Sequence, residues 1–235
     1  MDFNFDIAAQ FTASREGLYQ CLHSDAGNWT FGAVGQGNLV GTMRGISAPV
    51  MVRWLGDASM VTKSVMQSIT QDQFNAIARC LYWRAINGDQ LPAGLDLLLF
   101  DFAFNSGVAR AAKQLQRVLC MQPDEIDGDI GELTLEAVLH APVQEITLAL
   151  SDRYKRRLQD DLGVTSDGII GPGTLKAIKA QDARTRALVY ACASLQDASY
   201  RSFKGFAQFG RGWLGRLDQR VEAAVSLLTS VPALT

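Results

Sequence analysis

The sequence has no run of eighteen consecutive apolar residues, the length typical of a membrane-spanning helix. It also lacks the basic start of a signal peptide, because Met1–Asp6 carries two acids and no lysine or arginine. These absences argue against a membrane-spanning protein and against export through a cleaved leader. We therefore expect synthesis in the cytoplasm without a signal peptide, and no stable association with a membrane.

Paired cysteines are missing too. The four cysteines lie far apart, without the short spacing of zinc sites: Cys21, Cys80, Cys120 and Cys192. We therefore expect buried, reduced thiols and predict neither a bound metal nor another cofactor. Alternating strand patterns are equally scarce, which predicts an all-α or mainly helical protein.

Charge is unevenly distributed along the 235 residues, although the net charge is only −2. Residues 1–150 carry 9 basic and 16 acidic side chains, a balance of −7. Residues 151–235 carry 13 basic and 8 acidic side chains, a balance of +5. The basic part suits either a polyanion or an ordinary solvated helix surface, and we favour the solvated surface. We expect a monomer that binds no nucleic acid.

The chain begins with apolar residues at helical spacing: Phe3, Ile7, Phe11 and Leu18. At about 100° per residue, Glu16 lies roughly opposite this stripe, so we expect its carboxylate to face solvent or a cleft. Residues 20–47 are rich in glycine and are predicted to be loop, with at most a short hairpin.

Two helices are predicted from their end signals. Ser47-Ala48-Pro49 combines a capping serine with proline in the first turn, and the helix that it starts ends before Gly56. The spacing of Thr70 and Gln73 is that of a capping box, and starts a helix that runs to Asn87–Gly88.

The apolar run 95–104 is too continuous for a surface helix and predicts a buried central helix that ends at Asn105-Ser106-Gly107. Another helix is expected over 108–119. Near the C-terminus, aromatic residues alternate with glycines over 206–213. We interpret these aromatics as attaching the last helix to the core rather than as a stacking surface for sugars.

A near-repeat occupies the middle of the chain. Residues 113–116 precede an Asp-Gly turn at 127–135, and residues 156–159 precede a similar turn at 167–175. Both copies follow the order helix, Asp-Gly turn, second glycine, helix, with the turns 40 residues apart. This pattern resembles the helical peptidoglycan-binding module.

The N-terminal segment carries a set of side chains suited to glycoside hydrolysis. Glu16 follows the predicted helix, and Asp25 and Thr42 follow on the glycine-rich loop. A carboxylic acid protonates the leaving oxygen in this reaction, and a second carboxylate with a hydroxyl positions water or stabilises the oxocarbenium ion.

The order of these motifs resembles the glycoside hydrolase family 108 N-acetylmuramidases of phages and bacterial secretion loci. The matching fragments run from the N-terminal acid to the C-terminal aromatics: Glu16-Gly17-x-Tyr19, Asp25-x-Gly27, Thr42-x-x-Gly45-Ile46-Ser47, Phe100-Asp101-x-x-x-Asn105-Ser106-Gly107, Leu115-Gln116-Arg117 and Phe206-x-x-Phe209-x-x-Gly212-Trp213-x-x-Arg216. The resemblance implies a lysozyme-like, mainly helical fold with a helical peptidoglycan-binding-type second half. The implied substrate is bacterial peptidoglycan.

By this resemblance Glu16 is the general acid, Asp25 positions water or stabilises the cation, and Thr42 binds that water. Thr30 is the alternative threonine, but Thr42 has the fuller motif around it. We assign substrate binding to four residues: Tyr19, Thr30, Trp83 and Asn105. Leu18 departs from the family pattern, because it replaces the second glycine of the opening motif.

The predicted organisation has three parts: a catalytic region 1–106, a repeat-containing peptidoglycan-binding-type region 107–180, and C-terminal helices 181–235 that pack back on the catalytic core. The preferred activity is that of a phage-type endolysin, acting on the cell wall after release by a holin or a secretion system. A lytic transglycosylase and a non-catalytic wall-binding protein are the alternatives.

Overall fold

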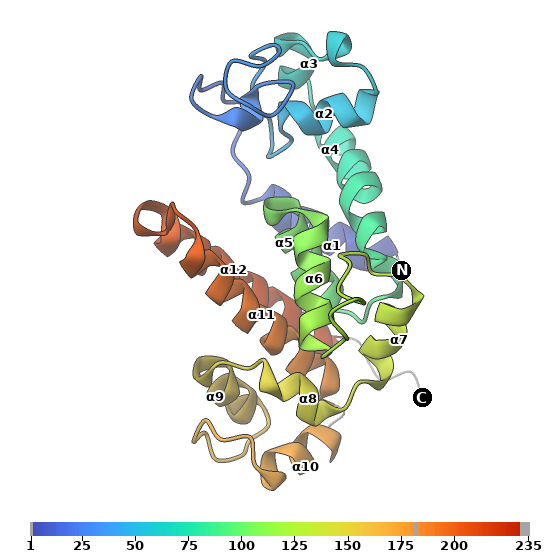
Figure 1. Cartoon of the computed structure of the whole chain (residues 1–235), viewed down its shortest axis with the longest axis vertical. Coiled ribbons are helices and arrows are strands. Elements are labelled where there is room, and N and C mark those ends of the chain that lie inside the picture. The colour runs from blue at the N-terminus through green and yellow to red at the C-terminus, as the bar shows by residue number, and fades with distance from the viewer. Residues whose placement is uncertain (1, 181–182, 231–235) are drawn as a thin grey trace. The chain divides into compact units, whose positions relative to one another are not determined.

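A computed structural model of the chain describes residues 2–180 and 183–230. The mainly helical fold predicted from the sequence is confirmed, and the described residues contain isolated β-bridges but no regular strand (Figure 1). Within the same residues, no helix combines the length and the apolarity that crossing a membrane requires.

The chain divides into two compact units, residues 9–82 and residues 1–8 together with 83–235. The first helix, α1 (Asp2–Ala13), contributes to both. The remaining helices of the unit 9–82 are short and are connected by loops: η1 (Ala26–Asn28), α2 (Ala48–Leu55), η2 (Ala58–Met60), α3 (Lys63–Gln67) and α4 (Gln71–Ala78).

The larger unit holds most of the helical residues. The π-helical turn η3 (Arg79–Trp83) leads into it, followed by two 3-10 turns and eight helices: η4 (Arg84–Ile86), η5 (Gly88–Gln90), α5 (Leu95–Ser106), α6 (Val108–Val118), α7 (Glu132–His140), α8 (Val143–Leu148), α9 (Asp152–Asp161), α10 (Pro172–Ala180), α11 (Arg184–Ser202) and α12 (Phe206–Ser230). The long helices α11 and α12 pack against each other and against α5 (Figure 1). In this unit α5 packs against α6 and against α11 and α12, and the boundaries at 106 and 180 stay a prediction.

The end signals of α2 and α4 predicted their starts correctly. Thr70 and Gln73 form a complete capping box at the start of α4. Gly56 ends α2 in the left-handed conformation, whereas the side chain of Ser47 makes no capping hydrogen bond. Beyond α4 the chain continues as the turns η3 and η4 rather than as a regular helix, up to Asn87 at φ 51°.

The apolar stripe predicted for the first helix is wrong in part. Phe11 is buried as predicted, but the other buried residues of α1 are Phe5, Ala8, Ala9 and Thr12, at the i, i+3, i+4, i+7 spacing of a helix. Leu18 lies beyond the helix and is 73% exposed. All four cysteines are free as expected, but Cys80 and Cys120 are exposed rather than buried.

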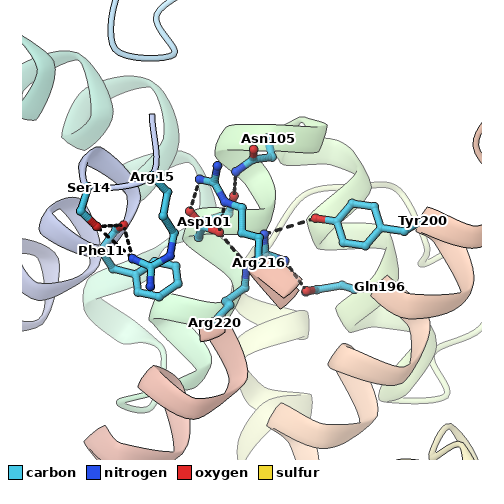
Figure 2. A network of polar contacts seen from close by, with 9 residues as sticks. All are labelled: Phe11, Ser14, Arg15, Asp101, Asn105, Gln196, Tyr200, Arg216 and Arg220. Atoms are coloured by element: carbon cyan, nitrogen blue, oxygen red, sulfur yellow. Dashed lines mark hydrogen bonds and ion pairs between the residues drawn. The ribbon is translucent and has the colours of Figure 1, made fainter. Parts of the chain in front are cut away.

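The central helix α5 is buried from Leu95 to Ala103, as the apolar run predicted. It also buries Asp101 completely, and an unpaired charge there would be costly. Two arginines one turn apart on α12 bind this carboxylate (Figure 2): Arg216 Nη2 lies 2.6 Å from Oδ1, and Arg220 Nε lies 2.7 Å from Oδ2. Arg220 is itself buried and donates to Gln196 as well. The pair therefore joins α12 to the core of its unit.

The first Asp-Gly turn is organised by a buried amide. Gln116 on α6 donates through Nε2 to Asp127 Oδ1 at 2.7 Å and to the Asp129 carbonyl at 2.9 Å. Its Oε1 accepts from the Gly128 N–H at 3.0 Å. Gly128 has φ 91°, a conformation that side-chain-bearing residues avoid. Hydrogen bonds from Gln116 and the Asp129 backbone hold the pKa of Asp127 below its usual range.

The second turn repeats this arrangement. Gln159 on α9 donates to Asp167 Oδ1 at 2.7 Å and to the Ile169 carbonyl at 2.9 Å, and accepts from Gly168 N–H at 2.8 Å. Gln159 is 1% exposed, as is Gln116. The polar groups of each Asp-Gly motif therefore find hydrogen-bond partners within the chain. These bonds are sufficient to explain why the motif forms a turn, and no bound ligand is needed.

The arginines around the second turn also have partners within the protein. Arg153 is paired with Asp218, Arg156 donates to the Ser166 carbonyl at 2.6 Å, and Arg157 lies 3.9 Å from the same Asp218 carboxylate. These contacts favour an ordinary helix surface for the basic C-terminal part over a surface that binds a polyanion.

A buried carboxyl group makes stability depend on pH. Asp96 is 1% exposed, and burial raises its pKa to about 6, against hydrogen bonds from Asn4 and the Leu97 N–H that lower it. The folded state therefore binds the proton of Asp96 more tightly than the unfolded state does. The contribution of this protonation to the free energy of unfolding is fully present below pH 3.8 and is lost as pH rises through 6.

We expect Asp96→Asn to remove this dependence. Between pH 4 and 7.5, the free energy of unfolding of the variant should gain about 2.5 kcal/mol on that of the wild type, since one pKa unit corresponds to about 1.4 kcal/mol. Urea unfolding across this pH range measures the difference. Parallel curves for the two proteins would contradict it.

Candidate active site

Glu16 lies three residues beyond the end of α1 and is partly exposed. The end of the helix is completed by two side chains, because Ser14 Oγ and Arg15 Nη1 each donate to the Phe11 carbonyl at 2.8 Å (Figure 2). Such bonds satisfy carbonyls that the last helical turn leaves unpaired. The carboxylate of Glu16 therefore extends from a defined helix end.

The chain after Glu16 pairs with the segment that carries Thr42. Gln20 and Thr42 exchange backbone hydrogen bonds of 2.9 and 2.8 Å, and the Arg44 N–H donates to the Gly17 carbonyl at 3.1 Å. Residues 22 and 27 positions apart in sequence are thus neighbours, and the two segments form one short antiparallel contact.

Asp25 is tied to this contact through its carboxylate. Oδ1 accepts from the Gly27 N–H at 2.9 Å, which caps η1, and Oδ2 accepts from Gln20 Nε2 at 2.9 Å. Both oxygens therefore have a fixed donor, and the loop presents Asp25 in one orientation.

Asn28 is the centre of the loop and is fully buried. Its Oδ1 accepts from Thr42 Oγ1 at 2.7 Å and from Gln20 Nε2 at 3.1 Å. Its Nδ2 donates to Gln20 Oε1 at 2.8 Å and to the Leu22 carbonyl at 2.9 Å. Asp25 and Thr42 therefore belong to one hydrogen-bonded cluster, which we call the amide cluster: Gln20, Asp25, Asn28 and Thr42. Sequence reasoning missed Gln20 and Asn28, which stand at no periodic or motif-defined position.

The glycine at position 27 leaves a small space beside this cluster. A Cβ atom at Gly27 would lie 3.3 Å from Asp25 Oδ1, 3.5 Å from Ser47 Cβ and 3.9 Å from Thr42 Oγ1. A side chain at position 27 would therefore lie close to both the aspartate and the threonine oxygen.

The structure separates the two candidate threonines. Thr30 is 2% exposed, and its Oγ1 accepts from the Asn38 N–H at 2.9 Å, within the loop 30–38. Its hydroxyl oxygen thus serves the loop as an acceptor, and the predicted substrate contact of Thr30 stays a prediction. Thr42 is the threonine that shares a cluster with Asp25.

Tyr19 is partly buried beneath the loop, and its hydroxyl donates to the Val40 carbonyl at 2.9 Å. Burial and the neighbouring Cys21 raise the pKa of Tyr19 to about 12, so the hydroxyl remains a hydrogen-bond donor. This contact supports the loop, and its predicted role toward a substrate stays a proposal.

The predicted substrate contact of Trp83 is wrong. Its side chain is completely buried between Phe5 and Phe100, at ring distances of 5.5 and 5.7 Å, so no sugar can stack on it. Asn105 lies in the larger unit near the end of α5, where its amide donates to the Asp101 carbonyl at 2.7 Å (Figure 2).

Tyr82 adds information on the surroundings of Glu16. Burial raises the pKa of Tyr82, the positive charge of Arg53 lowers it, and the negative charge of Glu16 raises it. All three residues belong to the unit 9–82, and their charges act on one another. Across the residues that the structure describes, no group of three or more histidine, cysteine, aspartate or glutamate side chains is arranged to hold a metal ion.

Comparison with protein families finds that residues 9–107 match the family Glycosyl hydrolase 108. The matched segment contains the whole unit 9–82 and continues to the end of α5. Every site residue predicted from the sequence lies inside it.

Among solved structures, the chain is similar to that of Brucella abortus SagA, with a TM-score of 0.57 and 26% sequence identity. The alignment covers 100% of this chain and 100% of that chain. Among curated proteins, none matches the sequence.

Proposed function

We propose that the protein is an N-acetylmuramidase, because residues 9–107 match the family Glycosyl hydrolase 108. Its substrate is bacterial peptidoglycan, and it hydrolyses the β-1,4 bond between N-acetylmuramic acid and N-acetylglucosamine. The observation that carries the proposal is the amide cluster, which joins Asp25 and Thr42 beside the segment that follows Glu16.

In the proposed reaction, Glu16 protonates the glycosidic oxygen as the bond to the anomeric carbon breaks. Asp25 accepts a proton from the attacking water, and Thr42 binds the same water. Because position 27 carries no side chain, none stands there beside Asp25 Oδ1 and Thr42 Oγ1, and we propose that the water binds on this side of the cluster. This division of roles favours an inverting reaction, in which a water molecule stands between the second carboxylate and the sugar.

The biological setting that we propose is lysis of the bacterial wall by a phage-type endolysin, released by a holin. The alternative setting is a muramidase that serves a secretion system. In either setting the repeats within 107–180 are proposed to contact the wall, although their Asp-Gly residues are occupied by the turns themselves. The genes adjacent to this one distinguish the two settings.

Glu16→Gln preserves the shape of the side chain and removes the acid. We expect lysis of purified cell walls to fall by about 10²-fold or more, because general acid catalysis contributes factors of this size. Turbidity loss of wall suspensions measures the rate, and zymography shows whether the wild type cleaves at all. Full activity of the variant would refute the role of Glu16.

Sedimentation of the wild type with walls, without any clearing, would instead indicate a non-catalytic binding protein.

The products separate hydrolysis from the transglycosylase alternative. A hydrolase adds water, whereas a lytic transglycosylase leaves a 1,6-anhydro sugar that is lighter by one water molecule, about 18 Da. We expect mass spectrometry of the digest to find hydrated ends, and NMR at early times to find the α-anomer. Mainly anhydro products would overturn the hydrolase proposal, and an early β-anomer would overturn inversion.

Gly27→Ala tests the proposed position of water. The added methyl group lies close to the Asp25 and Thr42 oxygens, so we expect kcat to fall by about tenfold or more, since small displacements of reacting groups are costly. The melting temperature should change little. Gly212→Ala is the matched control, because a Cβ atom there meets no atom within 4 Å. Equal activity of the two variants would exclude water from this side of the cluster.

A further inference from the structure

The backbone of one residue determines the orientation of two side-chain amides. The Leu22 N–H, which can only donate, lies 3.1 Å from Gln20 Oε1, and the Leu22 carbonyl, which can only accept, lies 2.9 Å from Asn28 Nδ2. Exchanging oxygen and nitrogen in either amide would oppose two donors or two acceptors. Both amides therefore have a single permitted orientation.

These orientations assign every hydrogen in the amide cluster. Gln20 Nε2 must face Asp25 Oδ2 and Asn28 Oδ1, and it donates to both. Asn28 Oδ1 then faces Thr42 Oγ1 at 2.7 Å and can only accept. The other neighbour of the threonine hydroxyl, the Gly27 carbonyl at 3.3 Å, can only accept as well. The single hydroxyl hydrogen of Thr42 is therefore directed into the loop.

The consequence concerns the outer side of the cluster. With its hydrogen directed inward, Thr42 presents oxygen lone pairs, and the Asp25 carboxylate presents only acceptors. A water molecule between them must donate both of its hydrogens, one to each oxygen. Its own lone pairs are then directed away from the loop.

We propose that Gln20 and Asn28 are positioning residues that orient the attacking water by fixing Thr42 as an acceptor and holding Asp25 through one oxygen. This inference rests on the proposed function. The water lone pair forms the bond to the anomeric carbon, and the electrons of the broken bond pass to the leaving oxygen. That oxygen takes the proton of Glu16, and the water gives one proton to Asp25.

Gln20→Glu is the sharpest test, because it is isosteric and places a carboxylate oxygen where Nε2 lies 2.9 Å from Asp25 Oδ2. Two carboxylates at this distance share a proton. We expect the acid limb of the pH profile of kcat/KM to move upward by about one pH unit or more, with activity recovering at higher pH. KM above the limb should stay unchanged, because Gln20 contacts no substrate in this proposal.

Gln36→Glu is the matched control, since it adds the same charge to an exposed position of the same loop. Its acid limb should coincide with that of the wild type. Asn28→Asp is a second test variant. It replaces Nδ2 by an oxygen that faces two acceptors, Gln20 Oε1 and the Leu22 carbonyl. We expect that variant to raise the acid limb and to lower kcat by about tenfold or more at the same wall concentration.

The outcomes separate the inference from the function on which it rests. If the wild type cleaves walls while Gln20→Glu and Asn28→Asp retain the acid limb of the wild type, the positioning role is wrong and the muramidase proposal stands. If the wild type cleaves no wall at any pH, the proposed function fails first. Lower melting temperatures with an unchanged acid limb would identify the cluster as purely structural and would overturn the inference.

Discussion

The segment between α1 and α2 depends on the burial of one neutral polar side chain, Asn28. This segment has no regular strand, so its chain cannot satisfy its polar groups by a ladder of backbone bonds. Asn28 supplies two donors and one acceptor in a single plane and uses all of them. A buried charge would cost far more than this amide, and an apolar residue would remove the hydrogen bonds that Asn28 makes to Leu22, Gln20 and Thr42.

The same physical solution recurs in the larger unit. Gln116 and Gln159 are buried, and each amide bonds the carboxylate and the backbone of the Asp-Gly turn that follows its helix. At Asn28, Gln116 and Gln159 alike, a side-chain amide makes the hydrogen bonds to the backbone that a neighbouring strand would make in a sheet. The polar groups of turns built in this way are satisfied within the chain itself.

Features with local causes were predicted well from the sequence. The capping box of α4, the glycine after α2 and the apolar run of α5 act on their own neighbours, so their spacing is sufficient evidence. Features decided by tertiary contacts were predicted poorly. Trp83 is buried because Phe5 and Phe100 surround it, and Arg153 is neutralised because Asp218 on a distant helix meets it. Neither contact can be predicted from the number of aromatic or basic residues in the sequence.

The candidate site divides in the same way. Glu16, Asp25 and Thr42 were identified from their motifs, whereas Gln20 and Asn28 acquire meaning only when the loop closes and Leu22 orients them. Their chemistry also explains why amides stand there. A lysine or arginine at position 20 would hold Asp25 equally well but would neutralise it. An amide donates a hydrogen bond to the same oxygen and leaves the negative charge intact, and the proposed role of Asp25 as proton acceptor requires that charge.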